Sequence, residues 1–191
     1  MTDALVAGVG GQGVLSAAAL LAEAARRDGF EVHQAEVHGM SQRGGTVRAT
    51  LRISSDPIHG DLVPTGGADL VIGLEPLEAL RCLPALRPGG MLVSSLDPVA
   101  DLPGYPEPER MRAALAQVPG AVLLPAAGLA RAAGSGRALN LVVVGAASPF
   151  LPVRMAVLES CIAARFAAAG ERVVEANLRA LRAGREAAVP V

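Results

Sequence analysis

The chain has 191 residues, which is enough for one well-formed hydrophobic core, and we expect a single domain over residues 1–191. Its net charge of −1 and aromatic content of 2% argue against the basic surface and stacking rings that nucleic-acid binding requires. The most apolar stretch, residues 139–152, contains Asn140 and is interrupted by Pro149 and Pro152, so we expect no membrane-spanning helix. Neither nucleic acid nor membrane is an expected partner.

Strand and helix patterns alternate over most of the chain. Strands are predicted at residues 4–9, 30–35, 46–53, 69–74, 91–95 and 121–124, and helices at residues 14–27, 76–86 and 109–117. From Leu129 onward the pattern becomes largely helical, with candidates at residues 139–147, 153–168 and 171–183. The alternation predicts an α/β fold: a single Rossmann-like domain with a mostly parallel sheet, helices on both faces and a helical C-terminal region.

Two local features refine this prediction. Residues 46–53 alternate between apolar and polar side chains, which indicates a half-exposed strand near a sheet edge or against a polar partner. Arg48 and Arg52 would then lie on its solvated face. Residues 88–90 (PGG) predict a turn between the helix at 76–86 and the strand at 91–95.

The two cysteines, Cys82 and Cys161, lie far apart and form no metal-binding spacing. We therefore expect no iron–sulfur cluster and no metal site in this chain, and both thiols in the core. The same cysteine usage favours a reducing, cytoplasmic location, and no Lys or Arg precedes the first apolar stretch as a secretory signal would require.

A glycine-rich turn follows the first predicted strand. The sequence GVGGQG at residues 8–13 fits G-x-G-x-x-G and opens a predicted helix, the context in which backbone amides meet a phosphate. Glu36 stands about 23 residues beyond Gly13, near where a ribose-binding acid is found in dinucleotide folds. A nicotinamide-binding site is therefore one interpretation. Close packing of strand on helix, without any ligand, is another.

The segment EVHGMSQRGG, residues 36–45, follows no helical or strand period and is rich in hydrogen-bonding groups. Such a polar, glycine-punctuated loop is a candidate site, since loops carry much of a protein's binding chemistry. An ordinary solvated connection is the alternative. Elsewhere, Glu75 and Glu78 could form a carboxylate pair, although Glu75 beside Pro76 also fits the first turn of a helix. Asn140 could cap a helix.

Taken together, these blocks resemble the gamma-type subunits of 2-oxoacid:acceptor oxidoreductases, and among them most closely the indolepyruvate:ferredoxin type. The resemblance rests on five blocks that keep the family's order: GVGGQG at residues 8–13, EVHGMSQRGG at 36–45, LEPLEALR at 74–81, RPGG at 87–90 and RALNLVVVGA at 137–146.

The resemblance implies a role as one part of a larger enzyme. A larger alpha subunit would carry thiamine diphosphate and 4Fe-4S clusters, and the two chains would form a heterotetramer. The complex would oxidatively decarboxylate an arylpyruvate such as indolepyruvate with coenzyme A, giving an acyl-CoA and passing electrons to ferredoxin. This chain alone would bind none of these cofactors and would be inactive. A stand-alone NAD(P)-binding oxidoreductase and a non-catalytic docking subunit remain as alternatives.

On this interpretation two segments would form a shared site. Backbone amides at Gly10, Gly11 and Gly13, with the amide side chain of Gln12, would meet an anionic group such as a coenzyme A phosphate. Arg43 would neutralise a phosphate or a substrate carboxylate, and His38 would donate a hydrogen bond or relay a proton. A purely structural role for His38 is equally open. The remaining site residues of the polar segment are Gln42, Gly44 and Gly45.

Overall fold

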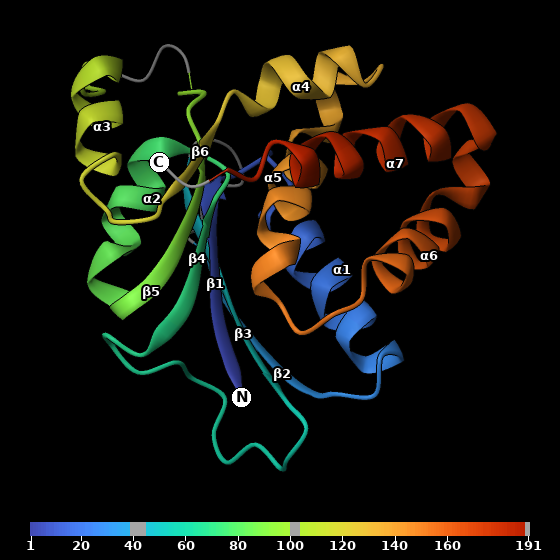
Figure 1. The fold of residues 1–191 in the computed structure, drawn as a ribbon, viewed down its shortest axis with the longest axis horizontal. Coiled ribbons are helices and arrows are strands. Elements are labelled where there is room, and N and C mark those ends of the chain that lie inside the picture. Colours follow the sequence, from blue (N-terminus) through green and yellow to red (C-terminus); the bar gives the residue numbers. More distant parts are fainter. Residues whose placement is uncertain (39–44, 100–103, 190–191) are drawn as a thin grey trace.

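Six strands form one sheet in the computed structural model, which describes residues 1–38, 45–99 and 104–189 (Figure 1). They are β1 (Thr2–Val9), β2 (Glu31–His38), β3 (Thr46–Ser54), β4 (Ala68–Gly73), β5 (Leu86–Ser95) and β6 (Val122–Leu124). Their order across the sheet is β2-β3-β1-β4-β5-β6. β3 pairs antiparallel with β1 and β2, whereas β1, β4, β5 and β6 pair in parallel. The predicted α/β class with a mostly parallel sheet is confirmed.

Helices cover both faces of the sheet, as predicted. They are α1 (Val14–Arg27), α2 (Pro76–Cys82), α3 (Pro108–Leu115), α4 (Ala126–Ala132), α5 (Leu139–Ala147), α6 (Met155–Phe166) and α7 (Glu171–Glu186). α2 packs on β1, β4 and β5 on one face, and α3 packs against α2. α1 and α5 lie on the other face, with α6 and α7 outside them (Figure 1). The predicted helical C-terminal region is confirmed.

Small residues bring the layers close together. α1 buries Ala17, Ala18 and Ala22 against the sheet. α5 and α7 cross at Gly145 and Gly184, where a methyl group would lie 1.9 Å from Leu181 O and 1.8 Å from Val142 O respectively. This close packing compensates for the scarcity of aromatic side chains, because dispersion contacts grow as backbones approach.

The strand predicted at residues 30–35 is longer than expected. β2 continues through Glu36 and Val37 to His38, so the first three residues of the polar segment are strand and not loop. The reason is pairing: Glu36, Val37 and His38 lie opposite Ala49, Arg48 and Val47 of β3, which the sequence pattern of one strand alone does not reveal.

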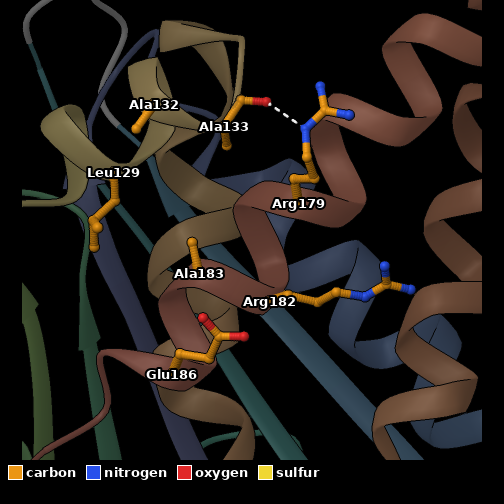
Figure 2. A pocket seen from close by; sticks show the side chains of 7 residues that line it. All are labelled: Leu129, Ala132, Ala133, Arg179, Arg182, Ala183 and Glu186. Carbon is orange, nitrogen blue, oxygen red and sulfur yellow. Dashed lines mark hydrogen bonds between the residues drawn. The ribbon is translucent and has the colours of Figure 1, made fainter.

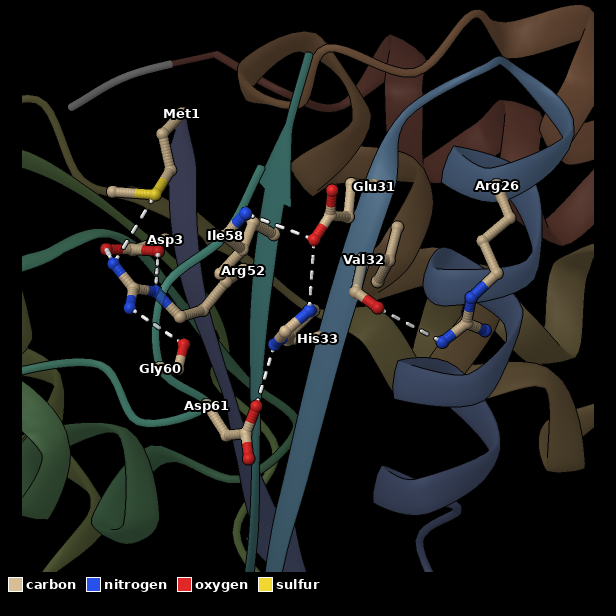
Figure 3. A network of polar contacts seen from close by, with 10 residues as sticks. All are labelled: Met1, Asp3, Arg26, Glu31, Val32, His33, Arg52, Ile58, Gly60 and Asp61. Carbon is tan, nitrogen blue, oxygen red and sulfur yellow. Dashed lines mark hydrogen bonds and ion pairs between the residues drawn. The ribbon is translucent and has the colours of Figure 1, made fainter. Parts of the chain in front are cut away.

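β3 lies between β1 and the edge strand β2, so it is near the sheet edge, as predicted. Its alternation is confirmed at Val47, Ala49 and Leu51, which are buried. The prediction that Arg52 lies on a solvated face is wrong. Arg52 is 8% exposed, and its Nε donates to Asp3 Oδ1 at 2.9 Å (Figure 3). The buried partner raises the pKa of Arg52 and keeps the guanidinium charged.

Two boundaries around the second helix also differ. α2 ends at Cys82 and a 3₁₀ turn follows at Leu83–Ala85, since Pro84 cannot continue the helical hydrogen bonding. The turn predicted at residues 88–90 lies inside β5, which begins at Leu86. There the register between β4 and β5 shifts, so the PGG sequence forms an irregularity within the strand.

Both cysteines are buried core residues, as predicted. Burial raises the pKa of each thiol, which disfavours the reactive thiolate. Within the described residues, no helix is both long and apolar enough to cross a membrane.

Candidate functional site

The glycine turn lies at the carboxyl edge of the sheet, where ligands bind in open α/β folds. Residues 10–13 connect the end of β1 to the start of α1. Gly11 and Gly13 have φ of +100° and +82°, conformations that side chains other than glycine rarely adopt. α1 has no acidic side chain in its first turn. Its amide N–H groups therefore present uncompensated partial positive charge at this edge.

The side chain of Gln12 links this turn to Leu74, the residue that follows β4. Its Oε1 accepts a hydrogen bond from Val9 N at 2.8 Å, and its Nε2 donates to Leu74 O at 3.4 Å. A methyl group at Gly8 would lie 2.8 Å from Gln12 Oε1 and 3.1 Å from Leu74 Cβ, so a larger residue there would crowd the turn. Both polar ends of the Gln12 side chain thus make internal contacts, whereas the sequence suggested that they would meet a ligand.

The two glycine-rich segments of the sequence meet at this edge. Gly10 N donates to Gly45 O at 2.9 Å, which joins the turn to the end of the polar segment. His38 ends β2, opposite Val47. The predicted site residues Gln42, Arg43 and Gly44, together with the side chain of His38, lie outside the described part of the structure.

A second helical start borders the turn. A 3₁₀ turn at Gly136–Ala138 leads directly into α5, and together with the glycine turn it borders a pocket of about 430 Å³. The pocket is lined by Gly11, Gln12, Gly136, Arg137 and Leu139. Arg137 is exposed, and among the described residues no acidic side chain lines the pocket. Two helical N-termini and a guanidinium at one pocket suit an oxyanion.

Asn140 connects these two helical starts. Its Nδ2 donates to Gly13 O at 3.5 Å, and its Oδ1 accepts from Leu141 N at 2.9 Å. The expectation that Asn140 caps a helix is wrong, because α5 begins one residue earlier, at Leu139. A methyl group at Gly13 would lie 2.8 Å from Asn140 Nδ2, which explains glycine at that position.

Arg137 lines this pocket but is not among the site residues predicted from the sequence, although it lies in the RALN block. The available signal was a single arginine directly before an apolar helix. That signal is weak, because only the fold brings residue 137 beside residues 11 and 12.

The two glutamates of the LEPLEALR block lie near this edge and are buried. Glu75 caps α2, accepting from Glu78 N at 2.8 Å, and it also accepts a hydrogen bond from Tyr105 Oη. Glu78 Oε1 accepts from Thr46 Oγ1 at 3.1 Å and from Arg81 Nη1 at 2.5 Å. Glu75 therefore has the structural role at the helix start that its position beside Pro76 suggested.

Another pocket, of about 360 Å³, lies between α4 and α7 (Figure 2). Its lining includes Leu129 and several alanines, and its arginines already have partners. Arg179 Nε donates to Ala133 O at 3.0 Å, and Arg182 Nε donates to Glu159 Oε1 at 2.7 Å. It contains none of the residues that the sequence singled out, so the pocket at the glycine turn is the better candidate.

The sheet order bears on the dinucleotide interpretation. In a dinucleotide fold the strand carrying the ribose-binding acid lies beside β1. Here β3 separates β2, with Glu36, from β1. Glu36 accepts a hydrogen bond from Gln34 Nε2 at 2.7 Å on the exposed surface. This geometry disfavours NAD(P) binding. Among the described residues, no group of three or more His, Cys, Asp or Glu could hold a metal ion.

Comparison with known proteins gives a consistent result over nearly the whole chain. The model of the pyruvate ferredoxin/flavodoxin oxidoreductase family matches residues 3–187. The chain is 36% identical over 188 residues to the indolepyruvate oxidoreductase subunit IorB of Methanothermobacter thermautotrophicus, covering 94% of this chain and 93% of that protein.

Two solved structures share the fold. The gamma subunit of a keto/oxoacid ferredoxin oxidoreductase from Geobacter sulfurreducens has a TM-score of 0.74 and 25% identity, covering 98% of both chains. The 2-oxoglutarate:ferredoxin oxidoreductase of Magnetococcus marinus, solved with 2-oxoglutarate, coenzyme A and succinyl-CoA, has a TM-score of 0.79 and 24% identity. That match covers 98% of this chain and 31% of the Magnetococcus chain.

Proposed function

This chain belongs to the pyruvate ferredoxin/flavodoxin oxidoreductase family, and from that premise we propose that it is the smaller, gamma-type subunit of an indolepyruvate-type 2-oxoacid:ferredoxin oxidoreductase. The observation that carries the choice of indolepyruvate is the 36% identity to a subunit of an indolepyruvate oxidoreductase over almost the full length of both chains. The larger subunit of the complex would provide thiamine diphosphate and 4Fe-4S clusters.

The proposed reaction is an oxidative decarboxylation. An arylpyruvate and coenzyme A would give the aryl-acetyl-CoA, carbon dioxide and a proton, while two electrons pass through the clusters to ferredoxin. Thiamine diphosphate, when bound in the larger subunit, supplies the electron sink that decarboxylation needs. This chain's part is to bind and orient an anionic group at the shared site.

The pocket beside the glycine turn suits that part. Backbone amides at the start of α1, and at the start of the 3₁₀ turn before α5, can donate hydrogen bonds to an oxyanion. The Arg137 guanidinium can do the same, so this binding needs neither a metal ion nor a protonated carboxyl group. The volume of about 430 Å³ is sufficient for a phosphate-bearing end of a ligand. We therefore assign the pocket to a coenzyme A phosphate. His38, Gln42 and Arg43, with Gly44 and Gly45, would form the wall facing the larger subunit.

Co-expression with the larger subunit tests the function. The purified complex should reduce a viologen dye when indolepyruvate and coenzyme A are both present, and each chain alone should not. An assembled complex that is inactive with every arylpyruvate and aliphatic 2-oxoacid would refute the proposal. Tight binding of NAD by the isolated chain would instead favour the dinucleotide alternative.

A non-catalytic docking subunit is the second candidate. The internal hydrogen bonds of Gln12 favour this candidate, because a side chain predicted to bind a ligand is instead bonded to the backbone of its own chain. Arg43→Ala in the assembled complex separates the two functions. Undiminished activity would support a docking role, and a loss of at least tenfold would support participation in the site.

A further inference from the structure

One part of the sheet is only partly covered by helices: among the described residues, α2 reaches it where Thr46 Oγ1 donates to Glu78 Oε1 at 3.1 Å. On the side of α2, the strands β2 and β3 present Ala35, Val37, Thr46, Arg48 and Thr50, which we call the open strand face. The register fixes their common side, since Val37 lies opposite Arg48 and Ala35 opposite Thr50. Val37 is 69% exposed, an unusual environment for a valine on a strand, and the other four are half-buried.

The covered parts of this side end where the open strand face begins. α2 packs on β1, β4 and β5. The far half of β2 and β3 is covered by the segment after β3: Ile58 N donates to Glu31 Oε1 at 3.0 Å, and Asp61 Oδ1 lies 2.7 Å from His33 Nδ1 (Figure 3). The open strand face therefore lies between two covered regions, at the carboxyl edge of β2.

Two buried polar atoms at this face have no hydrogen-bond partner in the described part of the chain. One is Arg48 Nε, on the open strand face itself. The other is Glu78 Oε2, whose neighbouring Oε1 accepts from Thr46 Oγ1 of the same face. The side chain of Glu78 is 3% exposed. Buried groups without partners are rare in native proteins because each costs desolvation free energy, so each requires an explanation.

We propose that the open strand face is the docking surface for the larger subunit, which would cover Val37 and supply a carboxylate or carbonyl oxygen to Arg48. This inference rests on the proposed function, since it needs that partner. Charge complementarity selects the occupant: the half-buried, cationic side chain of Arg48 favours a partner surface that offers hydrogen-bond acceptors. If a second copy of this chain docked face to face about a twofold axis, the Arg48 side chains of the two copies would approach each other, and their guanidinium groups would repel.

The position of this face links docking to the candidate site. Thr46 begins β3 directly after Gly45, whose carbonyl oxygen accepts from Gly10 N of the glycine turn. A partner seated on the open strand face would therefore reach the same edge of the sheet as the pocket beside the glycine turn. Docking and formation of a shared site would be one event.

Disruption of the surface gives the first test. Tagged chain carrying Val37→Asp, co-expressed with the larger subunit, should capture at least tenfold less of that subunit than the unmodified chain. Val173→Asp, at a valine of α7 that is 39% exposed, is the matched control and should capture the normal amount. Circular dichroism should show both variants folded. Equal capture by the Val37 and Val173 variants would overturn the proposal.

Thiol protection gives a second test that does not depend on disruption. Cys82 and Cys161 are buried, so Val37→Cys and Val173→Cys each add one accessible thiol. A maleimide dye should label both in the isolated chain, and in the complex labelling at residue 37 should slow at least tenfold while residue 173 is unaffected. Unchanged labelling at residue 37 would refute the docking surface but leave the proposed function standing.

Two other results are informative. Failure of the unmodified chain to form any complex with the larger subunit would refute the proposed function, and the inference with it. A dimer of the isolated chain that Val37→Asp converts to monomer, with capture of the larger subunit intact, would assign the face to self-association and overturn the inference alone.

Discussion

The guanidinium of Arg137 borders the pocket beside the glycine turn, where it would add a full positive charge to two partial ones. If a coenzyme A phosphate binds there, Arg137→Ala in the assembled complex should raise the KM for coenzyme A by about tenfold to a hundredfold, since hydrogen bonds to charged groups contribute about 1.5–3 kcal/mol. The KM for the 2-oxoacid should change little. Arg131→Ala, on the exposed surface of α4, is the control. An unchanged KM for coenzyme A would place its phosphates elsewhere.

Glu75 predicts a pH dependence of stability. Burial raises the pKa of its carboxyl above the ordinary value of 4.5, against the lowering effect of the hydrogen bonds from backbone amides. The folded state therefore binds this proton more tightly than the unfolded state, and the free energy of unfolding should fall as pH rises from 4.5 through the raised pKa. Glu75→Gln should flatten that part of the profile in urea unfolding, whereas Glu109→Gln, at an exposed position, should not. Parallel profiles for Glu75→Gln and the unmodified chain would contradict the assignment.

Gly13 should resist substitution because of its backbone conformation. Its φ of +82° costs a non-glycine residue about 1–2 kcal/mol, and a methyl group would also press on Asn140 Nδ2. Gly13→Ala should therefore lower the free energy of unfolding by at least that amount. Gly128→Ala is the opposite control: it lies inside α4 with no atom within 4 Å of the added methyl group, and it should stabilise by about 0.5–1 kcal/mol. Denaturant unfolding of both variants decides the point.

At the scale of elements, the sequence predicted what depends on local pattern. The strand–turn–helix unit around residues 8–13 and the alternation in β3 could be read directly, because period and glycine placement are local signals. The extension of β2 to His38 and the burial of Arg52 could not. Both depend on strand pairing: β3 holds the end of β2, and β1 brings Asp3 to Arg52.

The candidate site was predicted in part for the same reason. Gly10, Gly11 and Gly13 could be recognised from a motif confined to six residues, and the structure brings them to Gly45. Arg137 and Asn140 come from the far end of the sequence, and no pattern in one chain connects them to that turn. Of the residues that line the pocket, the sequence pointed to Gly11 and Gln12 but not to Gly136, Arg137 or Leu139.

The crossing of α5 and α7 should be the least tolerant element contact in the fold. A methyl group at Gly145 or Gly184 would overlap a backbone carbonyl oxygen that cannot rotate away, so the helices would have to separate. Overpacking of this kind costs about 1–3 kcal/mol and occasionally more, and we expect Gly184→Ala at the upper end. The destabilisation is measured as the fall in melting temperature of Gly184→Ala, with Gly128→Ala as the control. A melting temperature equal to that of the unmodified chain would show that the helices can slide apart freely.

The two faces of the sheet differ in how many apolar residues are buried against them. The face with α1 and α5 belongs to a large cluster that extends to α6 and α7, whereas the face with α2 and α3 has a smaller cluster of its own. α5 buries every residue from Leu141 to Ala147, but α3 buries only Met111 and Leu115. Local opening is easiest where few apolar contacts are lost, so α3 should open well before α5.

Hydrogen exchange followed by mass spectrometry tests this difference and its functional consequence. Amides of α5 should exchange near the rate set by global unfolding, and those of α3 at least a hundredfold faster. The pocket beside the glycine turn lies at the starts of α1 and α5, so it would be preformed on the stable side of the sheet and ready to bind without ordering. Docking of the larger subunit on the open strand face should then slow exchange in β2 and leave α5 nearly unchanged. Equal exchange in α3 and α5 would show that the two faces unfold as one unit. The pocket would then gain no extra stability from lying on the face with α1 and α5.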